Sequence, residues 1–475
     1  MTIGQDNMKY HELGHWLTES AKWVDHYYST LSKRPVRPNI APGEFTKKLS
    51  LSPPEKAQSV KTVFEDFKNI VPDAMTHWQH PKFFAYFPAN ASPASIFAES
   101  LSNSMGAQAM LWQTSPAATE METVVIDWLR QALGLKEGFK GTIQDTATTA
   151  TFCAVLTMRE KALGFSGLKD GLYGSQKLRI YASDNAHSSI EKAVRLSGIG
   201  ENNLCKIELD KNLSINCAKL ELELKKDIKD GHVPAGLILS LGGTSIGASD
   251  NILPLMSLAK KYNLYTHIDA AWAGSAMLCP EFRHLWEGVD MADSIVFNPH
   301  KWLGAQFDCS IQFLKDPTSQ INTLGLRPAY LETLDVEEVT NYNEWTIPLG
   351  RRFRALKIWF LIRVYGLEQL RGMLRNHITW AKELENLFEA DKDFKVITSS
   401  PFGLFTFQLL KEGESSDEST KKLLNLINAD GECYLTQTLT REKFVIRVSV
   451  GSFETTREDV LRVYEIASKF GKVIS

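Results

Sequence analysis

Short apolar runs alternate with helix-length amphipathic segments from about residue 177 onward, and this alternation constrains the fold more than any other feature. The predicted elements are strands at 178–182, 235–241 and 264–268, helices at 188–196 and 252–262, and further apolar runs at 294–297 and 310–314. Strands alternating with helices of this length are typical of βαβ units and a mainly parallel sheet. Sites in open α/β sheets lie beyond the carboxyl ends of the strands, so residues that follow these strands are the first candidates for chemistry.

Length and composition describe an ordinary globular protein with a small partner. A chain of 475 residues can bury a large core, and two or three structural units are expected. The net charge is −3, and basic clusters such as Arg351-Arg352-Phe353-Arg354 are short. A slightly acidic chain with only short basic clusters lacks the positive surface that binds a phosphate backbone. A nucleic acid is therefore not expected as a partner.

The N-terminal residues, the lack of a long apolar segment and the cysteine spacing favour a cytoplasmic protein. Residues 1–6 are polar and lack the basic and apolar regions of a secretion signal. The most apolar later segment, 358–362, is too short to span a bilayer, so no membrane partner is expected. The six cysteines show no CxxC spacing, which fits buried thiols in a reducing compartment better than disulfides or a zinc site. No metal is predicted.

The N-terminal segment combines an amphipathic helix with an extended linker. Apolar residues recur at helical spacing over 8–31, and prolines punctuate 34–43. The linker carries the helix away from its own domain, so its aromatic stripe needs another surface, and a second subunit is one candidate. A further helix is expected to begin near Pro53-Pro54-Glu55.

The C-terminal part has the pattern of a separate α+β unit. Its predicted elements are helices at 350–365, 378–387 and 456–468 and strands at 404–409 and 444–450. The preceding stretch, 316–346, is read as a long irregular segment, a feature typical of lids.

Lys301 follows the apolar run 294–297 through the turn Asn298-Pro299. A partly desolvated lysine has a depressed pKa, and its free amine can attack an aldehyde cofactor. The chain has 53 lysines and arginines, and a solvated surface charge is the simpler interpretation of any one of them. The neighbouring motifs decide between these interpretations.

Other polar residues also stand at strand ends. Asp269 follows the strand at 264–268 and precedes small residues, so it could pair with a protonated pyridine nitrogen. His187 and Thr244 occupy similar positions. The hydroxyl-rich run 141–151 opens a helix and could bind an anion, although it could equally be an N-cap followed by threonines. Neither GxGxxG nor GxxxxGK[ST] occurs here, so no dinucleotide or NTP is indicated.

Two aromatic-rich segments, 77–88 and 110–116, are either core or a wall for a flat apolar ligand.

Four longer motifs together resemble a known family. They are Asn298-Pro299-His300-Lys301-Trp302, His267-Ile268-Asp269-Ala270-Ala271-Trp272-Ala273-Gly274, Cys279-Pro280-Glu281-Phe282-Arg283 and Ile347-Pro348-Leu349-Gly350-Arg351-Arg352-Phe353-Arg354. In this order they resemble the motifs of group II pyridoxal-phosphate decarboxylases, and most closely those of aromatic L-amino acid decarboxylases. The resemblance runs from Tyr10 to about Leu461.

The resemblance implies an α/β fold of the aspartate-aminotransferase type, fold type I. It implies a mainly parallel seven-stranded sheet, a smaller C-terminal α+β domain and an intertwined homodimer with the active site at the subunit interface. The domain limits expected are 1–85 for an N-terminal helical segment packing on the partner subunit, 86–355 for the cofactor-binding domain and 356–475 for the small domain.

The resemblance also implies roles for individual residues. Lys301 would bind pyridoxal 5'-phosphate covalently, Asp269 would pair with the ring nitrogen, and His187 would stack on the ring. The phosphate would be held by Thr146, Ala147, Thr148, Asn298 and His300, and Thr244 and Ala271 would line the cofactor. Tyr330 occupies the place of the family's mobile-loop tyrosine. The resemblance implies that it donates a proton to the carbanion left after CO2 departs.

The substrate wall departs from the family pattern. Ala89 stands where animal enzymes carry a threonine, and Gln108 and Met110 replace apolar and aromatic residues. The wall expected for an aromatic amino acid comprises Phe84, Tyr86, Ala89, Gln108, Met110, Trp112 and Gly350. The resemblance thus implies decarboxylation of tryptophan, tyrosine, dihydroxyphenylalanine or phenylalanine. The alternatives are an aromatic aldehyde synthase, a decarboxylase of a non-aromatic amino acid, an aminotransferase and a non-catalytic pyridoxal-binding homologue.

Overall fold

A computed structural model describes residues 8–326 and 339–474. Across these ranges, no helix combines the length and apolar character needed to cross a bilayer. The helices are α1 Tyr10–Leu31, α2 Val60–Ile70, α3 Pro93–Met105, α4 Pro116–Leu133, α5 Ala147–Ala162, α6 Gly167–Asp170, α7 Ser188–Leu196, α8 Cys217–Lys229, α9 Ile252–Lys261, α10 Thr318–Leu324, α11 Ala355–Ala390, α12 Asp417–Asp430 and α13 Arg457–Ile474.

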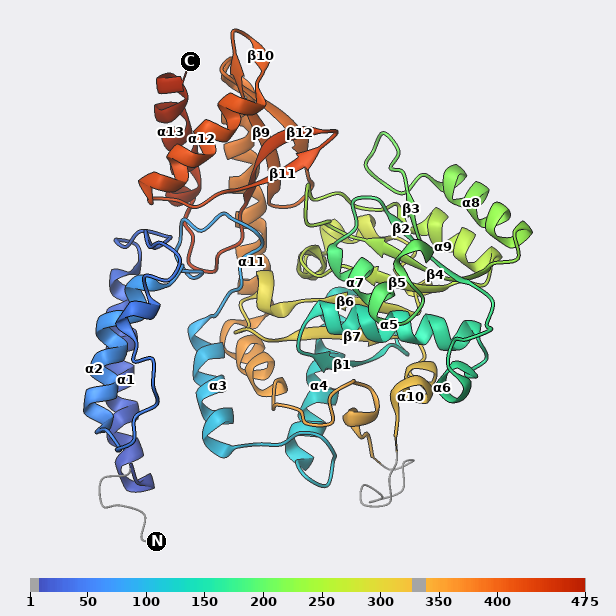
Figure 1. The fold of residues 1–475 in the computed structure, drawn as a ribbon, viewed down its shortest axis with the longest axis horizontal. Helices are drawn as coiled ribbons and strands as arrows, with labels where there is room; N and C mark the ends of the chain where they lie inside the picture. Colours follow the sequence, from blue (N-terminus) through green and yellow to red (C-terminus); the bar gives the residue numbers. More distant parts are fainter. Residues whose placement is uncertain (1–7, 327–338, 475) are drawn as a thin grey trace.

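A seven-stranded sheet forms the centre of the larger part of the molecule (Figure 1). Its strands are β1 Lys140–Gln144, β2 Leu178–Ser183, β3 Leu204–Ile207, β4 Val233–Ser240, β5 Tyr265–Asp269, β6 Ser294–Phe297 and β7 Ser310–Leu314. They lie in the order β1-β7-β6-β5-β4-β2-β3, and only β7 runs antiparallel to its neighbours. The predicted mainly parallel seven-stranded α/β fold is confirmed.

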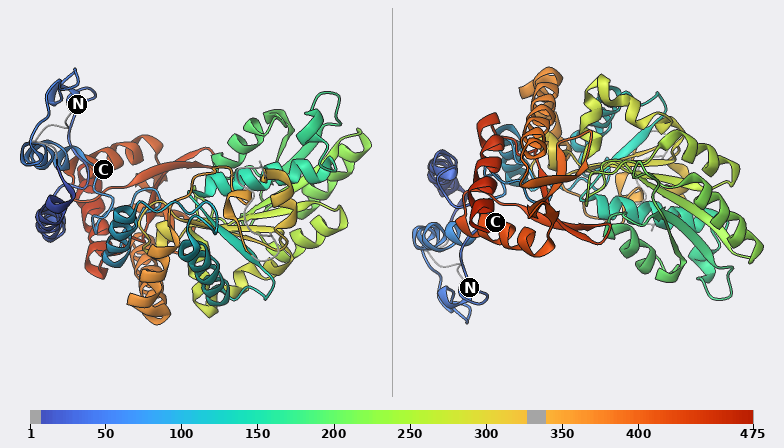
Figure 2. Two further views of the ribbon diagram at one scale, coloured as in Figure 1. Left: turned by 90° about the horizontal axis from the view of Figure 1, so that it is seen from below. Right: turned by 90° about the horizontal axis from the view of Figure 1, so that it is seen from above.

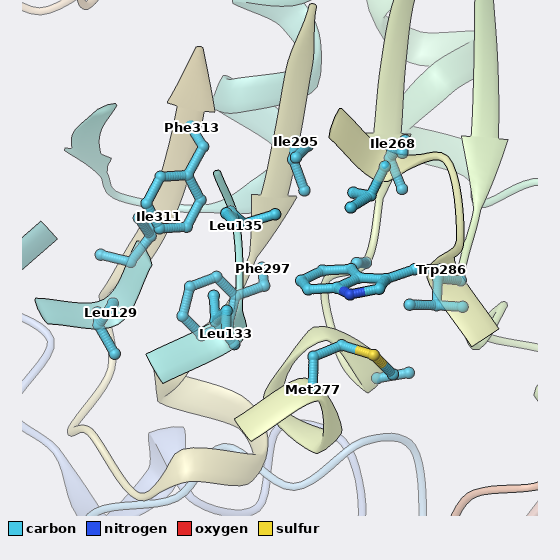
Figure 3. Close-up of a cluster of buried hydrophobic side chains, with 14 of the residues drawn as sticks. Leu129, Leu133, Leu135, Ile268, Met277, Trp286, Ile295, Phe297, Ile311 and Phe313 are labelled. Atoms are coloured by element: carbon cyan, nitrogen blue, oxygen red, sulfur yellow. The ribbon is translucent and has the colours of Figure 1, made fainter. Parts of the chain in front are cut away.

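Helices cover both faces of this sheet (Figure 2). Alternate residues of β4 show the division: Ile238 packs with residues of α5 and α7, whereas Leu237 and Leu239 belong to the core shared with α4, α8 and α9. Figure 3 shows the second layer, where Phe297 and Phe313 meet Leu129 and Leu133 of α4. Burial on both faces explains why most of these strands are rich in apolar residues, with the edge strand β1 as the exception.

A second, antiparallel sheet lies beside the first and carries the C-terminal strands. They are β8 Phe394–Ser399, β9 Leu404–Lys411, β10 Glu414–Ser415, β11 Thr436–Thr440 and β12 Lys443–Ser449. The order is β10-β9-β12-β11, with β8 on β9, and α12 and α13 pack against this sheet. This arrangement confirms the smaller C-terminal α+β unit.

Helices α1 and α2 project from one side of the molecule (Figures 1 and 2). The helix predicted over 8–31 is present as α1, but α2 begins at Val60 rather than near Pro53. The reason is local: the Ser59 hydroxyl accepts a hydrogen bond from the Thr62 amide and so caps the helix there.

Two further predictions need correction. The segment 316–346 contains α10 and a 3₁₀ turn at Tyr342–Glu344, so it is not irregular throughout. The helices expected at 350–365 and 378–387 are one long element, α11, whose path changes at Gly366, where φ is +67°. Glycine adopts this left-handed conformation without the steric cost that a Cβ imposes.

Candidate active site

A crevice opens where β4 and β5 end, and strand-end residues line it. The residues around it are Phe87, His187, Ser240, Gly242, Gly243, Thr244, Asp269, Ala271, Trp272 and Lys301. Five of the predicted cofactor residues, His187, Thr244, Asp269, Ala271 and Lys301, therefore meet in one place, although the chain separates the first from the last by more than a hundred positions.

Lys301 lies in a π-helical turn, Pro299–Leu303, directly after β6. Wide turns of this kind are rare and often occur at functional sites. Gly304 ends the turn with φ +95°, and a Cβ there would come within 2.5 Å of the Phe453 ring. Only glycine therefore fits at the end of the lysine-bearing turn.

Asn90 clamps this turn to the small sheet. Its Nδ2 donates to the Lys301 carbonyl at 2.6 Å and to the Gly451 carbonyl at 2.7 Å, and its Oδ1 accepts from the Phe453 amide at 2.9 Å. Asn90 is fully buried, so loss of these bonds would leave polar groups unsatisfied. The position of the lysine is thus fixed from two parts of the chain.

The amine of Lys301 is held in a desolvating environment. Burial lowers its pKa to about 8, Asp269 opposes this shift and Arg447 reinforces it. Its Nζ lies 5.1 Å from the centre of the Phe87 ring. About a tenth of the amine is therefore uncharged at pH 7, far more than for an ordinary lysine, and this fraction can act as a nucleophile.

His187 is oriented by its own backbone position. It is the N-cap of α7, and its Nδ1 accepts a hydrogen bond from the Ser189 amide at 3.2 Å. This bond leaves the proton on Nε2. Burial lowers the pKa of His187, so a neutral ring faces the crevice.

Asp269 ends β5, and one of its carboxylate oxygens accepts from the Ala271 amide at 3.0 Å. The bond fixes the carboxylate at the edge of the crevice, where it can face a protonated ring nitrogen. The flanking Gly242 has φ +70°, and a Cβ there would lie 2.4 Å from Ala273 Cβ. The backbone is thus packed too tightly around the crevice for a larger residue.

The predicted phosphate residues gather at the N-terminus of α5. Thr146 caps the helix, and the amides at 147 and 148 precede the first intrahelical bond, which runs from the Ala150 amide to the Thr146 carbonyl. Unpaired amides and the helix dipole favour an anion at this position. Ala147 packs in a small cluster with Ala271, which joins this helix end to the crevice.

Asn298 and His300 approach from the other side. The Asn298 amide donates to the Ala271 carbonyl at 2.9 Å, and its Oδ1 accepts from Ser310 Oγ at 2.7 Å. His300 Nδ1 accepts from the Cys309 amide at 2.9 Å, and burial lowers the pKa of His300 to about 3. The ring is therefore neutral with its proton on Nε2, where it can act as a hydrogen-bond donor to an anion.

The predicted substrate residues fall into separate groups. Phe84 is fully buried in the core of the small sheet, and its neighbour Phe87 lines the crevice in its place. Tyr86 is half exposed, and its hydroxyl lies 3.3 Å from that of Tyr434. The carbonyl of Ala89 accepts a hydrogen bond from the side chain of Gln79.

The remaining wall residues lie together on two neighbouring loops, outside the crevice lining. Gln108 Oε1 accepts from the Arg351 amide at 2.6 Å, and a Cβ at Gly350 would lie 3.2 Å from Gln108 Nε2. The Met110 carbonyl accepts from the Asn343 amide at 3.2 Å. Trp112 is bound through its amide to Asn341 Oδ1 at 3.0 Å. Tyr330 lies outside the described residues.

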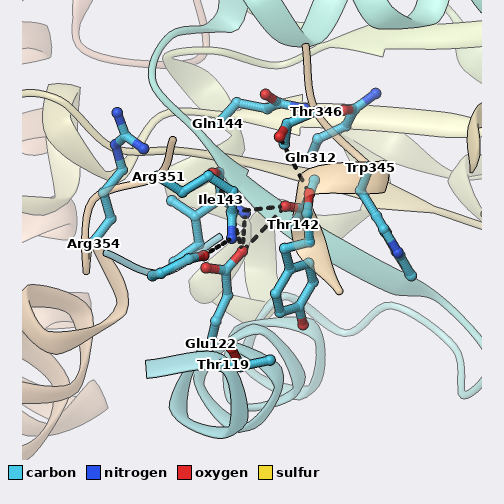
Figure 4. A network of polar contacts seen from close by, with 12 residues as sticks. Thr119, Glu122, Thr142, Ile143, Gln144, Gln312, Trp345, Thr346, Arg351 and Arg354 are labelled. Carbon is cyan, nitrogen blue, oxygen red and sulfur yellow. Dashed lines mark hydrogen bonds and ion pairs between the residues drawn. The ribbon is translucent and has the colours of Figure 1, made fainter. Parts of the chain in front are cut away.

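A buried ion pair anchors this wall to the large sheet (Figure 4). Arg351 Nη2 lies 2.6 Å from Glu122 Oε1, 3.1 Å from Thr142 Oγ1 and 3.0 Å from the Ile143 carbonyl. Both charged side chains are at most 3% exposed. The loop that ends in Gly350 is therefore tied to β1, the strand that leads into the helix end at Thr146.

The sequence did not single out Asn90 or Arg447 as parts of this region. Phe87 was included only within the aromatic segment 77–88, and Trp272 only within a family motif. Arg447 carries a recognisable signal, because it is a lone basic residue in the apolar strand 444–450. Asn90 carries none, since its partner Lys301 is 211 positions away.

Comparison with known proteins identifies the family. The family model for the pyridoxal-dependent decarboxylase conserved domain matches residues 42–410 of the sequence, more than half of the chain. The chain belongs to the pyridoxal-dependent decarboxylases. The tyrosine decarboxylase of Papaver somniferum is 34% identical over an alignment 491 residues long, which covers 98% of this chain and 94% of that protein. The phenylacetaldehyde synthase of Arabidopsis thaliana is 35% identical, covering 97% of this chain and 95% of that protein.

Solved decarboxylases share the whole fold. The Catharanthus roseus tryptophan decarboxylase in complex with L-tryptophan aligns with a TM-score of 0.93 at 32% identity, covering 98% of this chain and 99% of that one. Oryza sativa TDC with PLP and tryptamine aligns over the full length of both chains with a TM-score of 0.95 and 32% identity.

The residues present fit the cofactor of this decarboxylase family. The crevice joins an amine and a carboxylate, and a helix end with a neutral histidine donor lies beside it. These are the groups that an aldehyde, a pyridine nitrogen and a phosphate require. Pyridoxal phosphate is the cofactor of this enzyme, a carboxy-lyase by family.

Proposed function

We propose that this protein converts an aromatic L-amino acid, such as tryptophan, tyrosine, dihydroxyphenylalanine or phenylalanine, into its amine and CO2. The observation that carries the proposal is the meeting of a desolvated lysine amine, a carboxylate and a neutral histidine in one crevice of a decarboxylase fold. Relatives named tyrosine decarboxylase and tryptophan decarboxylase support the aromatic class.

When bound, pyridoxal phosphate supplies an aldehyde that combines with amines and a ring that withdraws electrons. Lys301 presents the amine that would hold it, and Asp269 would keep a proton on its ring nitrogen. His187 would cover the ring, while Thr146, Ala147, Thr148, Asn298 and His300 would hold the phosphate. The aromatic surfaces of Phe87 and Trp272 exclude water from the crevice, which favours loss of a charged carboxylate as CO2.

Tyr330 is the proposed donor of the proton that replaces the carboxylate on the substrate carbon. This role follows from the family motif alone. Aldehyde synthases of this family tend to lack the tyrosine or to alter the stacking histidine, and this chain has both Tyr330 and His187. Simple decarboxylation is therefore the favoured outcome.

We further propose that the active site is shared between two copies of the chain. The wall formed by Gln108, Met110, Trp112 and Gly350 stands apart from the crevice that holds Lys301, so a second subunit is a natural source of the missing wall.

An uncovered apolar groove supports the homodimer. It has a volume of about 980 Å³ and lies between α1 and α3, with Leu17, Val24, Ile96, Phe97 and Leu101 among its lining residues. Phe97 is 56% exposed and Leu17 is 47% exposed. Apolar surface of this extent is typical of an interaction site, and the N-terminal helix of a partner is the occupant proposed here.

A cytoplasmic location is also proposed. All six cysteines are free thiols in the structure, and five of them are buried. Free thiols are typical of a reducing compartment.

The test is an end-point assay of the purified protein with each of the four aromatic acids. The expected products are one amine and one CO2 per acid. Steady formation of aldehyde and hydrogen peroxide without amine would instead establish an aldehyde synthase, the activity for which the relative from Arabidopsis thaliana is named. Multiple turnovers with a keto-acid acceptor would indicate an aminotransferase. Cofactor binding without turnover would indicate a non-catalytic homologue.

A further inference from the structure

Arg447 is a buried cation that crosses from the small sheet to the crevice. It lies on β12 and is 3% exposed. No ion pair to it occurs within the described ranges, and its Nη2 is buried without a hydrogen-bond partner there. Burial lowers the pKa of Arg447 to about 9, so it is charged at neutral pH. A buried, unpaired charge is costly, and its presence calls for a function.

The side chain holds two segments of the crevice at once. Nε donates to the Thr244 carbonyl at 2.9 Å, and Nη1 donates to the Tyr86 carbonyl. The guanidinium carbon lies 4.6 Å from the centre of the Phe87 ring. Thr244 and Phe87 both line the crevice, whereas Arg447 does not. Arg447 therefore contacts the crevice lining through these two residues.

The segment that it holds is strained. Tyr86 has φ +46°, a left-handed conformation that is unfavourable for a residue with a side chain. Its amide donates to Thr436 Oγ1 at 3.3 Å, so β11 and β12 bind this residue on both sides. A strained backbone persists only where its surroundings fix it, and such residues cluster at active sites.

Phe87 links this strain to the lysine. The amine of Lys301 and the guanidinium of Arg447 both lie near the same Phe87 ring, at 5.1 Å and 4.6 Å from its centre. Moving Tyr86 would therefore shift the surface against which Lys301 packs. Loss of the guanidinium would also remove a positive charge that acts on Lys301.

We propose that Arg447 is a positioning residue of the small sheet, which fixes the strained Tyr86 backbone, and with it Phe87 and the Thr244 loop, in the geometry that the Lys301 crevice needs. Only the expected effect on kcat and KM rests on the proposed function. The geometry of the bound cofactor can be measured without any substrate.

The experiment compares holoenzymes carrying Arg447→Met, Arg447→Lys, Arg447→Ala and Lys443→Met. Lys443 is an exposed cation at the start of the same strand and serves as the matched control. Met removes the charge and both donated bonds, whereas Lys keeps the charge but lacks the planar fork that reaches two carbonyls. The readouts are the visible circular dichroism of the bound cofactor, which reports its seating, and separate kcat and KM values.

Arg447→Met is expected to change the cofactor dichroism and to lower kcat about 100-fold, the scale of a 1 Å misplacement, with KM changed less than about threefold. Arg447→Lys should fall between this variant and wild type, and Lys443→Met should match wild type. Guanidinium ion added to Arg447→Ala should restore part of the dichroism and of kcat. This rescue separates a missing contact from a protein that fails to fold.

Two results would overturn the assignment. One is an unchanged dichroism and kcat in Arg447→Met. The other is a rise in KM alone with unchanged dichroism, which would mean that the guanidinium contacts the substrate carboxylate directly. If wild type decarboxylates none of the four aromatic acids, the proposed function fails, and the dichroism of the variants still tests the positioning role.

Discussion

Single residues set the chemistry of the crevice, and Lys301 is the clearest case. Its pKa is lowered to about 8, mainly by burial. Below this pH the amine is protonated and unreactive toward an aldehyde, and above it the amine is free. The rate at which cofactor-free protein captures pyridoxal phosphate should therefore rise with pH and reach half its limit near pH 8. Stopped-flow absorbance measures this rate. A midpoint near the ordinary lysine value of 10.4 would contradict a desolvated amine.

Lys301→Ala provides the control for that measurement. Borohydride reduction followed by peptide mass spectrometry should find the pyridoxyl group on residue 301 of wild type and on no peptide of the variant. A pyridoxyl group on a different lysine would mean that this other lysine, and not Lys301, binds the cofactor.

Tyr330→Phe tests the proposed proton donor at the same scale. Removal of the hydroxyl leaves the cofactor residues untouched, so binding should persist while the product shifts from amine toward a carbonyl compound. Product analysis by chromatography measures the shift. An unchanged amine yield would remove Tyr330 from the mechanism.

Elements depend on how their ends are tied together, and the pair Arg351–Glu122 joins the wall loop to β1 and α4. Glu122→Gln removes one charge of a buried pair, which typically costs 3–5 kcal/mol because the partner stays buried and uncompensated. Urea unfolding should show this loss. Glu281→Gln breaks the half-exposed pair with Arg375 and should cost about 0–1 kcal/mol. Equal losses in the two variants would mean that burial does not determine the strength of these pairs.

Periodicity and apolar runs predicted most of the elements of the large sheet, because its strands are buried on both faces. These patterns did not predict β1, whose polar sequence Lys140–Gln144 pairs with β7 at the sheet edge. They also did not predict the short strand β3. Strand ends predicted Lys301, Asp269 and His187. Asn90 and Arg447 could not be predicted in the same way, because their roles arise from contacts with residues 211 and 361 positions away.

At the scale of the whole molecule, a shared active site has a measurable signature. Lys301→Ala damages the crevice, and Met110→Arg would damage the wall that we assign to the partner's site. When the two variants are mixed and reassociated, half of the dimers are mixed and each has one intact site, so about one quarter of wild-type activity should return. The recovery is measured by amine production.

The matched control mixes Lys301→Ala with Asp269→Ala. Both changes lie in the crevice of one chain, so no combination rebuilds a complete site and no activity should return. Recovery in both mixtures, or in neither, would contradict a wall supplied by the second copy.

The aromatic column beside the lysine has an optical consequence. Trp272 stacks on Phe87 at 4.4 Å and on Trp302 at 4.6 Å, and it lines the crevice. A pyridoxal chromophore bound there would accept excitation energy from these indoles, so tryptophan fluorescence should fall as the site fills. Trp272→Phe should weaken this quenching more than Trp359→Phe does, since Trp359 lies on α11 outside the crevice lining. The protein thus carries its own emission probe of cofactor occupancy.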